Sequence, residues 1–279
     1  MGDNKLMDMV LLPNWMPLLN MMDVALYQPF DMVKVTYQLT QQGYESGVAE
    51  RILKNYGIPG FYKGLSAGLL KEAIYSPTKL GSMMIWNKLT EASDGKPVPL
   101  CHTYMGLLTA SAIGTFVGCP ADLAMIRKQA NATLHYKHAF LADEGIFSYW
   151  KGAVPTVARS MALELGIIAV YYPSVKFFKE DCGLESSDYL LAADVASLSV
   201  AAVCSAPFDY VKTQMQTMQP DAFGKYPYTG PIDCAKKVLK SGGPKQFYRG
   251  IGPYIFRSFP QAALTVAILR DLRKVKRQN

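Results

Sequence analysis

The chain has few charged residues, few histidines and no paired cysteine motif. Only 18% of its 279 residues are charged and 50% are hydrophobic, whereas soluble domains average about 25% charged residues. This apolar content excludes an intrinsically disordered chain. The five cysteines are scattered and form no Cys-x-x-Cys, which argues against a disulfide scaffold or a zinc site. The three histidines have no ligand-type neighbours, so we expect no metal site.

Catalytic motifs are also missing. No Ser-His-Asp or Cys-His arrangement is present and the glycines form no nucleotide-binding loop, so we predict no enzyme. The net charge of +7 favours an anionic partner. Because no nucleic-acid recognition motif occurs, lipid or an anionic solute is the better candidate. Residues 1–8 are polar and show no signal or transit pattern, so we expect internal segments to direct the chain to a membrane.

One segment recurs three times, at intervals of about 90 residues. Each copy has a proline, an aspartate two residues later and a glutamine nine residues after the proline: Pro29, Asp31 and Gln38; Pro120, Asp122 and Gln129; Pro207, Asp209 and Gln216. Three residues after the aspartate stand Lys34 and Lys212 in the outer copies. The middle copy has Met125 there, with Arg127 two positions further on.

A second motif also recurs three times and consists of an aromatic residue, a cation and a glycine. Its copies are Tyr62-Lys63-Gly64, Trp150-Lys151-Gly152 and Tyr248-Arg249-Gly250. Seven residues beyond each glycine stands another cation, namely Lys71, Arg159 or Arg257. Several spaced features that recur together indicate a threefold repeat.

The segments around these motifs have the composition of long helices. Apolar stretches precede each proline at 9–28, 104–119 and 189–206, and others follow each glycine at 65–90, 153–178 and 251–273. Six segments of about 20 to 30 residues are long enough to cross a ~30 Å hydrocarbon layer. Charged residues lie inside them (Asp23, Lys71, Glu72, Lys79, Arg159, Glu164, Asp194 and Arg257), and such residues normally face a water-filled interior. We predict an all-α membrane protein with six transmembrane helices; a soluble all-α protein is the alternative.

The three Pro-x-Asp segments and the three aromatic-cation-Gly triplets resemble those of the mitochondrial carrier family, in particular its oxoglutarate/malate and dicarboxylate members. The resemblance covers the chain from about Val10 to Lys274. It implies a multi-pass fold in the inner mitochondrial membrane, with pseudo-threefold repeats at 1–99, 100–186 and 187–279. It also implies strict exchange of solutes at one central site that opens alternately to each side.

The Pro-x-Asp segments suggest a gate on the matrix side. Proline bends a helix, so three kinks would bring three helix ends together. Asp31, Asp122 and Asp209 would then pair with Lys34 and Lys212, and Gln38, Gln129 and Gln216 would brace the pairs. The resemblance also places Arg127 in this gate, because the oxoglutarate-type carriers have an apolar residue at the position of Met125 and an arginine two positions further on. The alternative is that Pro-Asp only starts a helix, because aspartate is a good N-cap.

Lys71, Arg159 and Arg257 occupy equivalent positions, so threefold symmetry would aim all three at one level of a central cavity. Three cations there would attract a small dianion, and arginine binds carboxylates in bidentate fashion. The family resemblance implies substrate contacts at Lys71, Tyr75, Lys79, Arg159, Ser160 and Arg257. Alternatively, the cations form fixed structural ion pairs with Glu72, Glu164 or Asp194.

The aromatic-cation-Gly triplets stand at predicted helix starts, where backbone N–H groups favour a phosphate. The resemblance implies cardiolipin at Lys63-Gly64, Lys151-Gly152 and Arg249-Gly250, as a bound lipid and with no other cofactor. A simple positive loop at an anionic membrane surface is the alternative.

The sequence departs from the family pattern at the opposite mouth. Asn87, Pro173 and Arg270 stand where the family has acidic residues, so we expect weak closure towards the intermembrane space and a resting state open to that side. The first hypothesis is a dicarboxylate exchanger for 2-oxoglutarate- or malate-like anions. The second is a carrier fold that no longer transports and serves as an accessory subunit of a respiratory complex. A proton or fatty-acid leak pathway is the third.

Overall fold

The computed structural model describes residues 16–39, 47–90, 100–130, 146–183, 188–219 and 225–264. Within these ranges the chain is helical and contains no strand. The helices that carry the repeated prolines are α2 (Met16–Leu39), α5 (Leu100–Ala130) and α8 (Asp188–Thr217). Those that follow the repeated glycines are α4 (Leu65–Thr90), α7 (Ala153–Lys176) and α10 (Ile251–Phe256), the last continued by helical residues 258–264. A π-helical turn, η3 (Phe177–Asp181), extends α7.

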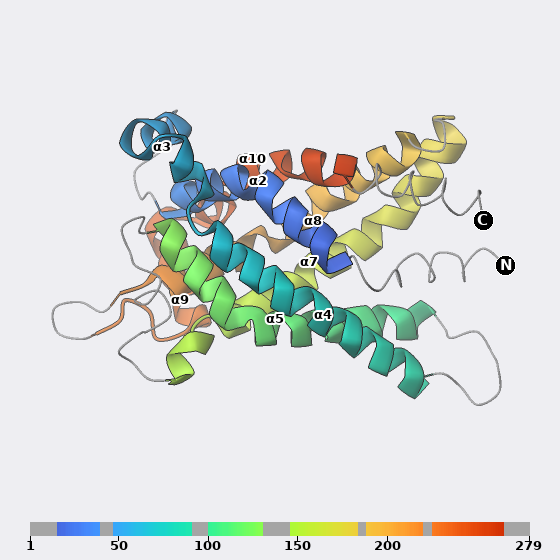
Figure 1. The fold of residues 1–279 in the computed structure, drawn as a ribbon, viewed down its shortest axis with the longest axis horizontal. Helices are drawn as coiled ribbons and strands as arrows, with labels where there is room; N and C mark the ends of the chain where they lie inside the picture. Colours follow the sequence, from blue (N-terminus) through green and yellow to red (C-terminus); the bar gives the residue numbers. More distant parts are fainter. Residues whose placement is uncertain are drawn as a thin grey trace.

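These six helices form a closed ring. Each packs against the next one along the chain, α2 on α4, α4 on α5, α5 on α7, α7 on α8 and α8 on α10, and α10 returns to α2. The long helices run roughly lengthwise along the molecule (Figure 1). The predicted six-helix fold is therefore confirmed.

Two short amphipathic helices lie at one end of the ring, on the left of Figure 1: α3 (Val48–Tyr56) and α9 (Pro231–Gly242). Val48 and Ile52 of α3 pack on Met32 of α2, while Cys234 and Val238 of α9 pack on α8. Short 3₁₀ turns precede the helices that follow the repeated glycines, α4, α7 and α10. They are η1 (Ile58–Tyr62), η2 (Ile146–Trp150) and η4 (Pro244–Tyr248). Burial of these apolar faces holds α3 against α2 and α9 against α8.

Pro29, Pro120 and Pro207 lie inside α2, α5 and α8. The alternative in which Pro-Asp begins a helix is therefore wrong. A proline inside a helix removes one backbone hydrogen bond and bends the segment. In each of the three proline-containing helices, the bend therefore lies just before the repeated aspartate and glutamine.

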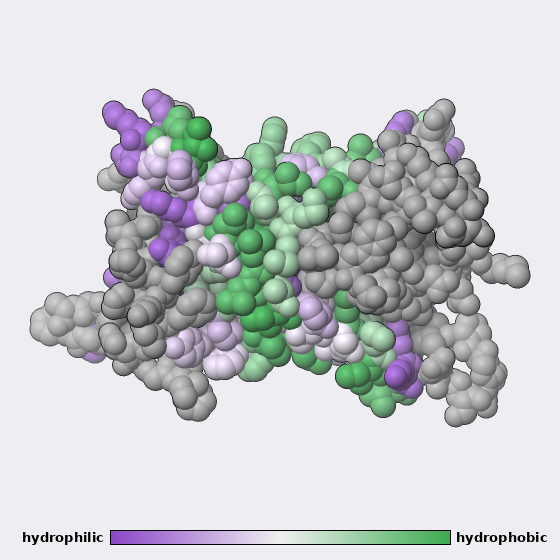
Figure 2. Space-filling model, in the orientation of Figure 1, coloured by the Kyte–Doolittle hydropathy of each residue, from purple (hydrophilic) through white to green (hydrophobic). Residues whose placement is uncertain are grey.

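The molecule is apolar outside and charged inside. Leu26, Ile85 and Ile113 are about half exposed or more, whereas Asp122 and Lys212 are buried. A hydrophobic band crosses the middle of the molecule, and hydrophilic side chains gather at the end that carries α3 (Figure 2). Three helices of the described ranges are long and apolar enough to span a bilayer, Cys101–Ala130, Ser148–Asp181 and Asp188–Thr217. This organisation is that of a membrane protein, and the soluble alternative is wrong.

Candidate solute cavity and gate

The ring encloses a cavity of about 360 Å³. All six side chains expected to contact substrate line it: Lys71, Tyr75 and Lys79 from α4, Arg159 and Ser160 from α7, and Arg257 at the end of α10. The Tyr75 hydroxyl oxygen lies 3.4 Å from Ser111 Oγ. The Ser160 hydroxyl donates to the carbonyl of Val157. The fold thus brings the six residues to one enclosed space.

Two of the expected gate pairs form between the proline-containing helices. Lys34 Nζ of α2 lies 2.8 Å from Asp209 Oδ2 of α8, and Lys212 Nζ of α8 lies 2.7 Å from Asp122 Oδ2 of α5. Each of the four side chains is at most 6% exposed. Charge pairs shielded from water in this way hold α2, α5 and α8 together.

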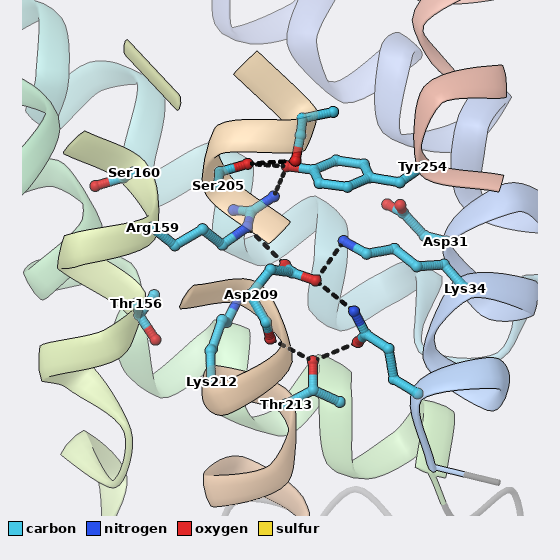
Figure 3. A network of polar contacts seen from close by, with 12 residues as sticks. Asp31, Lys34, Thr156, Arg159, Ser160, Ser205, Asp209, Lys212, Thr213 and Tyr254 are labelled. Atoms are coloured by element: carbon cyan, nitrogen blue, oxygen red, sulfur yellow. Dashed lines mark hydrogen bonds and ion pairs between the residues drawn. The ribbon is translucent and has the colours of Figure 1, made fainter. Parts of the chain in front are cut away.

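Glutamines brace both pairs. Gln38 Nε2 donates to Asp209 Oδ2 at 2.6 Å, and Gln216 Nε2 donates to Asp122 Oδ2 at 3.1 Å. Gln38 in turn accepts a hydrogen bond from the Thr213 hydroxyl at 2.7 Å, as Figure 3 shows around Asp209. The amides supply hydrogen bonds to carboxylates that are already paired, which a buried ion pair requires.

No third pair of this kind forms among the described residues, and the expectation that Gln129 braces a pair is wrong. Gln129 is buried, and neither atom of its amide has a hydrogen-bond partner in the described part of the chain. Arg127 Nε donates to the carbonyl of Gln216 at 3.4 Å, so Arg127 contacts α8, and the cation that pairs with Asp31 is Arg257. The reason is Met125, which packs in an apolar cluster with Val35, Ala67 and their neighbours and offers no charge at the pairing position.

The three cavity cations pair with the gate aspartates of the next repeat. Lys71 Nζ lies 3.1 Å from Asp122, Arg159 Nε lies 2.6 Å from Asp209, and Arg257 Nη1 lies 2.7 Å from Asp31. The arrangement is cyclic, since the third repeat pairs back to the first. The alternative partners Glu72, Glu164 and Asp194 are therefore wrong for these three cations; Lys79 alone pairs with Glu164.

Two of these contacts lack hydrogen-bond alignment. Arg159 Nε and Asp122 Oδ1 are buried and form no well-directed hydrogen bond within the described ranges, although each lies close to an opposite charge. Hydrogen bonds weaken steeply when they are misaligned. Attraction of opposite charges therefore holds these two contacts.

Sequence reasoning missed Tyr254, a buried residue of α10 in the upper part of the network in Figure 3. Its hydroxyl accepts from Arg159 Nη2 at 3.0 Å and lies 3.1 Å from Ser205 Oγ. Lys34 Nζ stands 3.6 Å from the centroid of its ring, a cation–π contact. Tyr254 precedes Arg257 by three residues, as Thr156 precedes Arg159, but the repeats share no residue type at this position.

The triplet glycines start α4, α7 and α10 with positive φ, +84° at Gly64, +78° at Gly152 and +79° at Gly250. A Cβ would lie 3.2 Å from the Met125 carbonyl at Gly64, 3.0 Å from Gln216 Cγ at Gly152 and 3.0 Å from the Lys34 carbonyl at Gly250. Glycine is required both for the left-handed backbone and for the close approach to the neighbouring gate helix. This packing role was not expected from the sequence.

The triplet lysines lie over aromatic rings. Lys63 Nζ is 3.4 Å from the centroid of Tyr56, and Lys151 Nζ is 3.5 Å from that of Tyr226. Partial burial, helped by the nearby charge of Lys128, lowers the pKa of Lys63. Arg249 ends η4, directly before Gly250. Phosphate binding at Lys63, Lys151 and Arg249 stays a prediction.

At the opposite mouth, Asn87 lies in α4 and Pro173 in α7. Arg270 lies outside the described residues. Weak closure at that mouth stays a prediction.

A ring of membrane helices around a charged cavity, closed at one end by ion pairs between symmetric helices, defines a membrane solute carrier. The comparison with known sequences specifies which one. A family model described as "Mitochondrial carrier protein" matches residues 19–91, 96–181 and 185–279. The chain belongs to the mitochondrial carrier family, whose members are multi-pass proteins of the inner mitochondrial membrane.

Several curated relatives match nearly end to end. The chain is 45% identical to a mitochondrial dicarboxylate/tricarboxylate transporter of Arabidopsis thaliana, over 92% of this chain and 91% of the relative. It is 33% identical to a probable mitochondrial 2-oxoglutarate/malate carrier of Dictyostelium discoideum, over 91% and 86%. It is 35% identical to the human mitochondrial 2-oxoglutarate/malate carrier, over 88% and 85%.

Proposed function

We propose that the protein exchanges small dicarboxylates, 2-oxoglutarate- or malate-like anions, across the inner mitochondrial membrane by alternating access. The observation that carries the proposal is the cyclic pairing of Lys71, Arg159 and Arg257 with the gate aspartates. The relatives named for dicarboxylate and 2-oxoglutarate/malate transport support the choice of anion.

The pairing gives the anion a way to act on the gate. A dicarboxylate that binds to the three cations Lys71, Arg159 and Arg257 must replace Asp122, Asp209 and Asp31 as their partners, and arginine's fork suits its carboxylates. The gate then retains only the Lys34–Asp209 and Lys212–Asp122 contacts. Because the anion competes with residues of the closed state, its binding shifts the equilibrium towards opening, by a coupling typically worth about 1–3 kcal/mol.

We also propose that the triplets Lys63-Gly64, Lys151-Gly152 and Arg249-Gly250 bind a cardiolipin phosphate at the helix starts. The lysines over aromatic rings and the amphipathic helices beside them suit a lipid surface. No observation in the described ranges favours the accessory-subunit alternative.

The proposal is tested by uptake of labelled 2-oxoglutarate into proteoliposomes loaded with malate. We expect Arg159→Gln to reduce kcat/KM by about 100-fold or more, because a charged contact in a low-dielectric site is lost. Lys237→Ala is the matched control, since Lys237 forms an exposed pair with Asp233 on α9. Equal uptake by the wild type and Arg159→Gln, with both folded by thermal unfolding, would remove the proposal.

A further inference from the structure

Among the described residues, the side chains that line the cavity are formally neutral in sum. Six basic side chains line it, namely Lys34, Lys71, Lys79, Arg159, Lys212 and Arg257. Six acidic side chains also line it, namely Asp23, Asp31, Glu72, Asp122, Glu164 and Asp209. A dianion that enters this space therefore leaves an excess of two negative charges unless something else changes charge.

The ion pairs leave two acids over. Asp209 contacts Lys34 and Arg159, Asp122 contacts Lys71 and Lys212, and the remaining pairs are Arg257 with Asp31 and Lys79 with Glu164. Asp23 and Glu72 form no ion pair in the described part of the chain. The group around Asp209 and the group around Asp122 each contain two cations and one anion, and so carry a net charge of +1 each. The carboxylates of Asp23 and Glu72 balance these two charges without direct contact.

Asp23 and Glu72 belong to one polar surface between α2 and α4. Asp23 Oδ1 is buried without a hydrogen-bond partner among the described residues. Glu72 is 9% exposed, and its Oε2 accepts from the Ser76 hydroxyl at 3.1 Å. Ser76 in turn accepts from Asn20 Nδ2 of α2 at 2.8 Å. A buried carboxylate held by a single hydroxyl and no cation is poorly compensated as an anion.

The charged and titratable groups around this pair are few. Asp23 and Glu72 act on each other, and the other groups that act on one of them are Tyr27 of α2, Lys71 of α4 and Arg257 beyond α10. Asp122 of α5 and Asp31 of α2 lie behind them as the partners of Lys71 and Arg257. Both basic groups in this set are the ones that a substrate carboxylate would neutralise. Once the anion holds Lys71 and Arg257, Asp23 and Glu72 lose the charges that stabilise them as carboxylates.

We propose that Asp23 and Glu72 form a proton-binding site coupled to the anion site, so that the dicarboxylate travels together with protons. The inference rests on the proposed function. A proton passes from cavity water to a carboxylate oxygen of Asp23 or Glu72 as the anion binds. It returns to water on the other side when the anion leaves, so protons are conserved.

The test measures 2-oxoglutarate/malate exchange in proteoliposomes as a function of external pH. Between about pH 7.5 and about pH 6 we expect the wild-type KM to fall with acidification, by up to about tenfold per pH unit for each coupled proton. Asp23→Asn or Glu72→Gln alone should leave a shallower slope, and the double variant should bind the anion with no slope. Asp194→Asn is the matched control, because this carboxyl lies on α8 and is not among the cavity-lining residues.

Proton uptake on binding gives an independent readout, because strict exchange of two proton-carrying anions moves no net protons across the membrane. Addition of neutralised 2-oxoglutarate to the protein in weakly buffered detergent solution with a pH-sensitive dye should make the solution more alkaline with the wild type and not with the double variant. Where a variant folds poorly, the shift in unfolding temperature caused by 2-oxoglutarate in detergent, measured at both pH values, replaces transport.

Equal pH slopes in the wild type and the double variant would overturn the proton site. Preferred exchange of an amino-dicarboxylate, without pH dependence, would also overturn it, because the two acids would then bind the ammonium group of the substrate. Absence of exchange for every dicarboxylate, by wild type and variants alike, would instead count against the proposed function.

Discussion

At the residue scale, single positions carry strict geometric requirements. Gly250 has φ +79° and no room for a Cβ, whereas Gly252, two residues later in α10, is surrounded by open space. Gly250 and Gly252 are close in sequence, but only Gly250 has a backbone conformation and a contact that require glycine. The two positions are therefore suited to a comparison of stability.

Gly250→Ala should destabilise the protein by about 1–3 kcal/mol, because alanine strains the left-handed backbone and meets the Lys34 carbonyl. Gly252→Ala should be neutral or stabilise by up to about 1 kcal/mol, since alanine favours a helix over glycine. Thermal unfolding in detergent measures both. A loss of equal size in the two variants would show that the contact with Lys34 carries no energetic weight.

At the scale of the elements, the repeat made much of the site predictable. Six helices and the Lys34–Asp209 and Lys212–Asp122 pairs follow from three matched motifs, because equivalent positions must meet around a pseudo-threefold axis. The pairing of Lys71 with Asp122 was not predictable from spacing, because it depends on how far the α4 side chain reaches towards α5. Tyr254 was missed because the repeats share no residue type at its position.

The exception within the repeat, Met125, is equally informative. Met125 packs among apolar residues, and Gln129 is buried without a hydrogen-bond partner among the described residues, where Asp31 pairs with Arg257. We expect a gate with two pairs in place of three to open more easily.

Met125→Lys should therefore complete the gate by pairing with Asp31, with Gln129 as the brace. We expect a higher unfolding temperature and a several-fold lower kcat. The control is Met125→Leu, which preserves volume and adds no charge. In a double-mutant cycle with Gln129→Leu, the lysine and the glutamine should couple by about 0.5–3 kcal/mol. No coupling between the two positions would contradict the missing-pair interpretation.

At the scale of the whole molecule, closure at one end determines which side reaches the cavity. The ion-paired layer joins the ends of α2, α5 and α8 near α3 and α9, whereas in the described residues Asn87 and Pro173 offer no acid at the other mouth. We propose that the end with α3 and α9 is the matrix side, so that the described state is closed to the matrix.

Thr115 of α5 lines the cavity and lies seven residues before Asp122, about 10 Å along the helix. In a background without the native cysteines, Thr115→Cys should react with a membrane-impermeant thiol reagent from the intermembrane-space side only. Addition of 2-oxoglutarate should make it reactive from the matrix side as well, since the anion displaces the aspartates that close that end. Arg159→Gln in the same background should abolish this substrate effect, because the anion then lacks the cation for which it competes. Reactivity from the matrix side without substrate would mean that the two gate pairs do not hold the bundle closed, and the coupling between anion and gate would have to be abandoned.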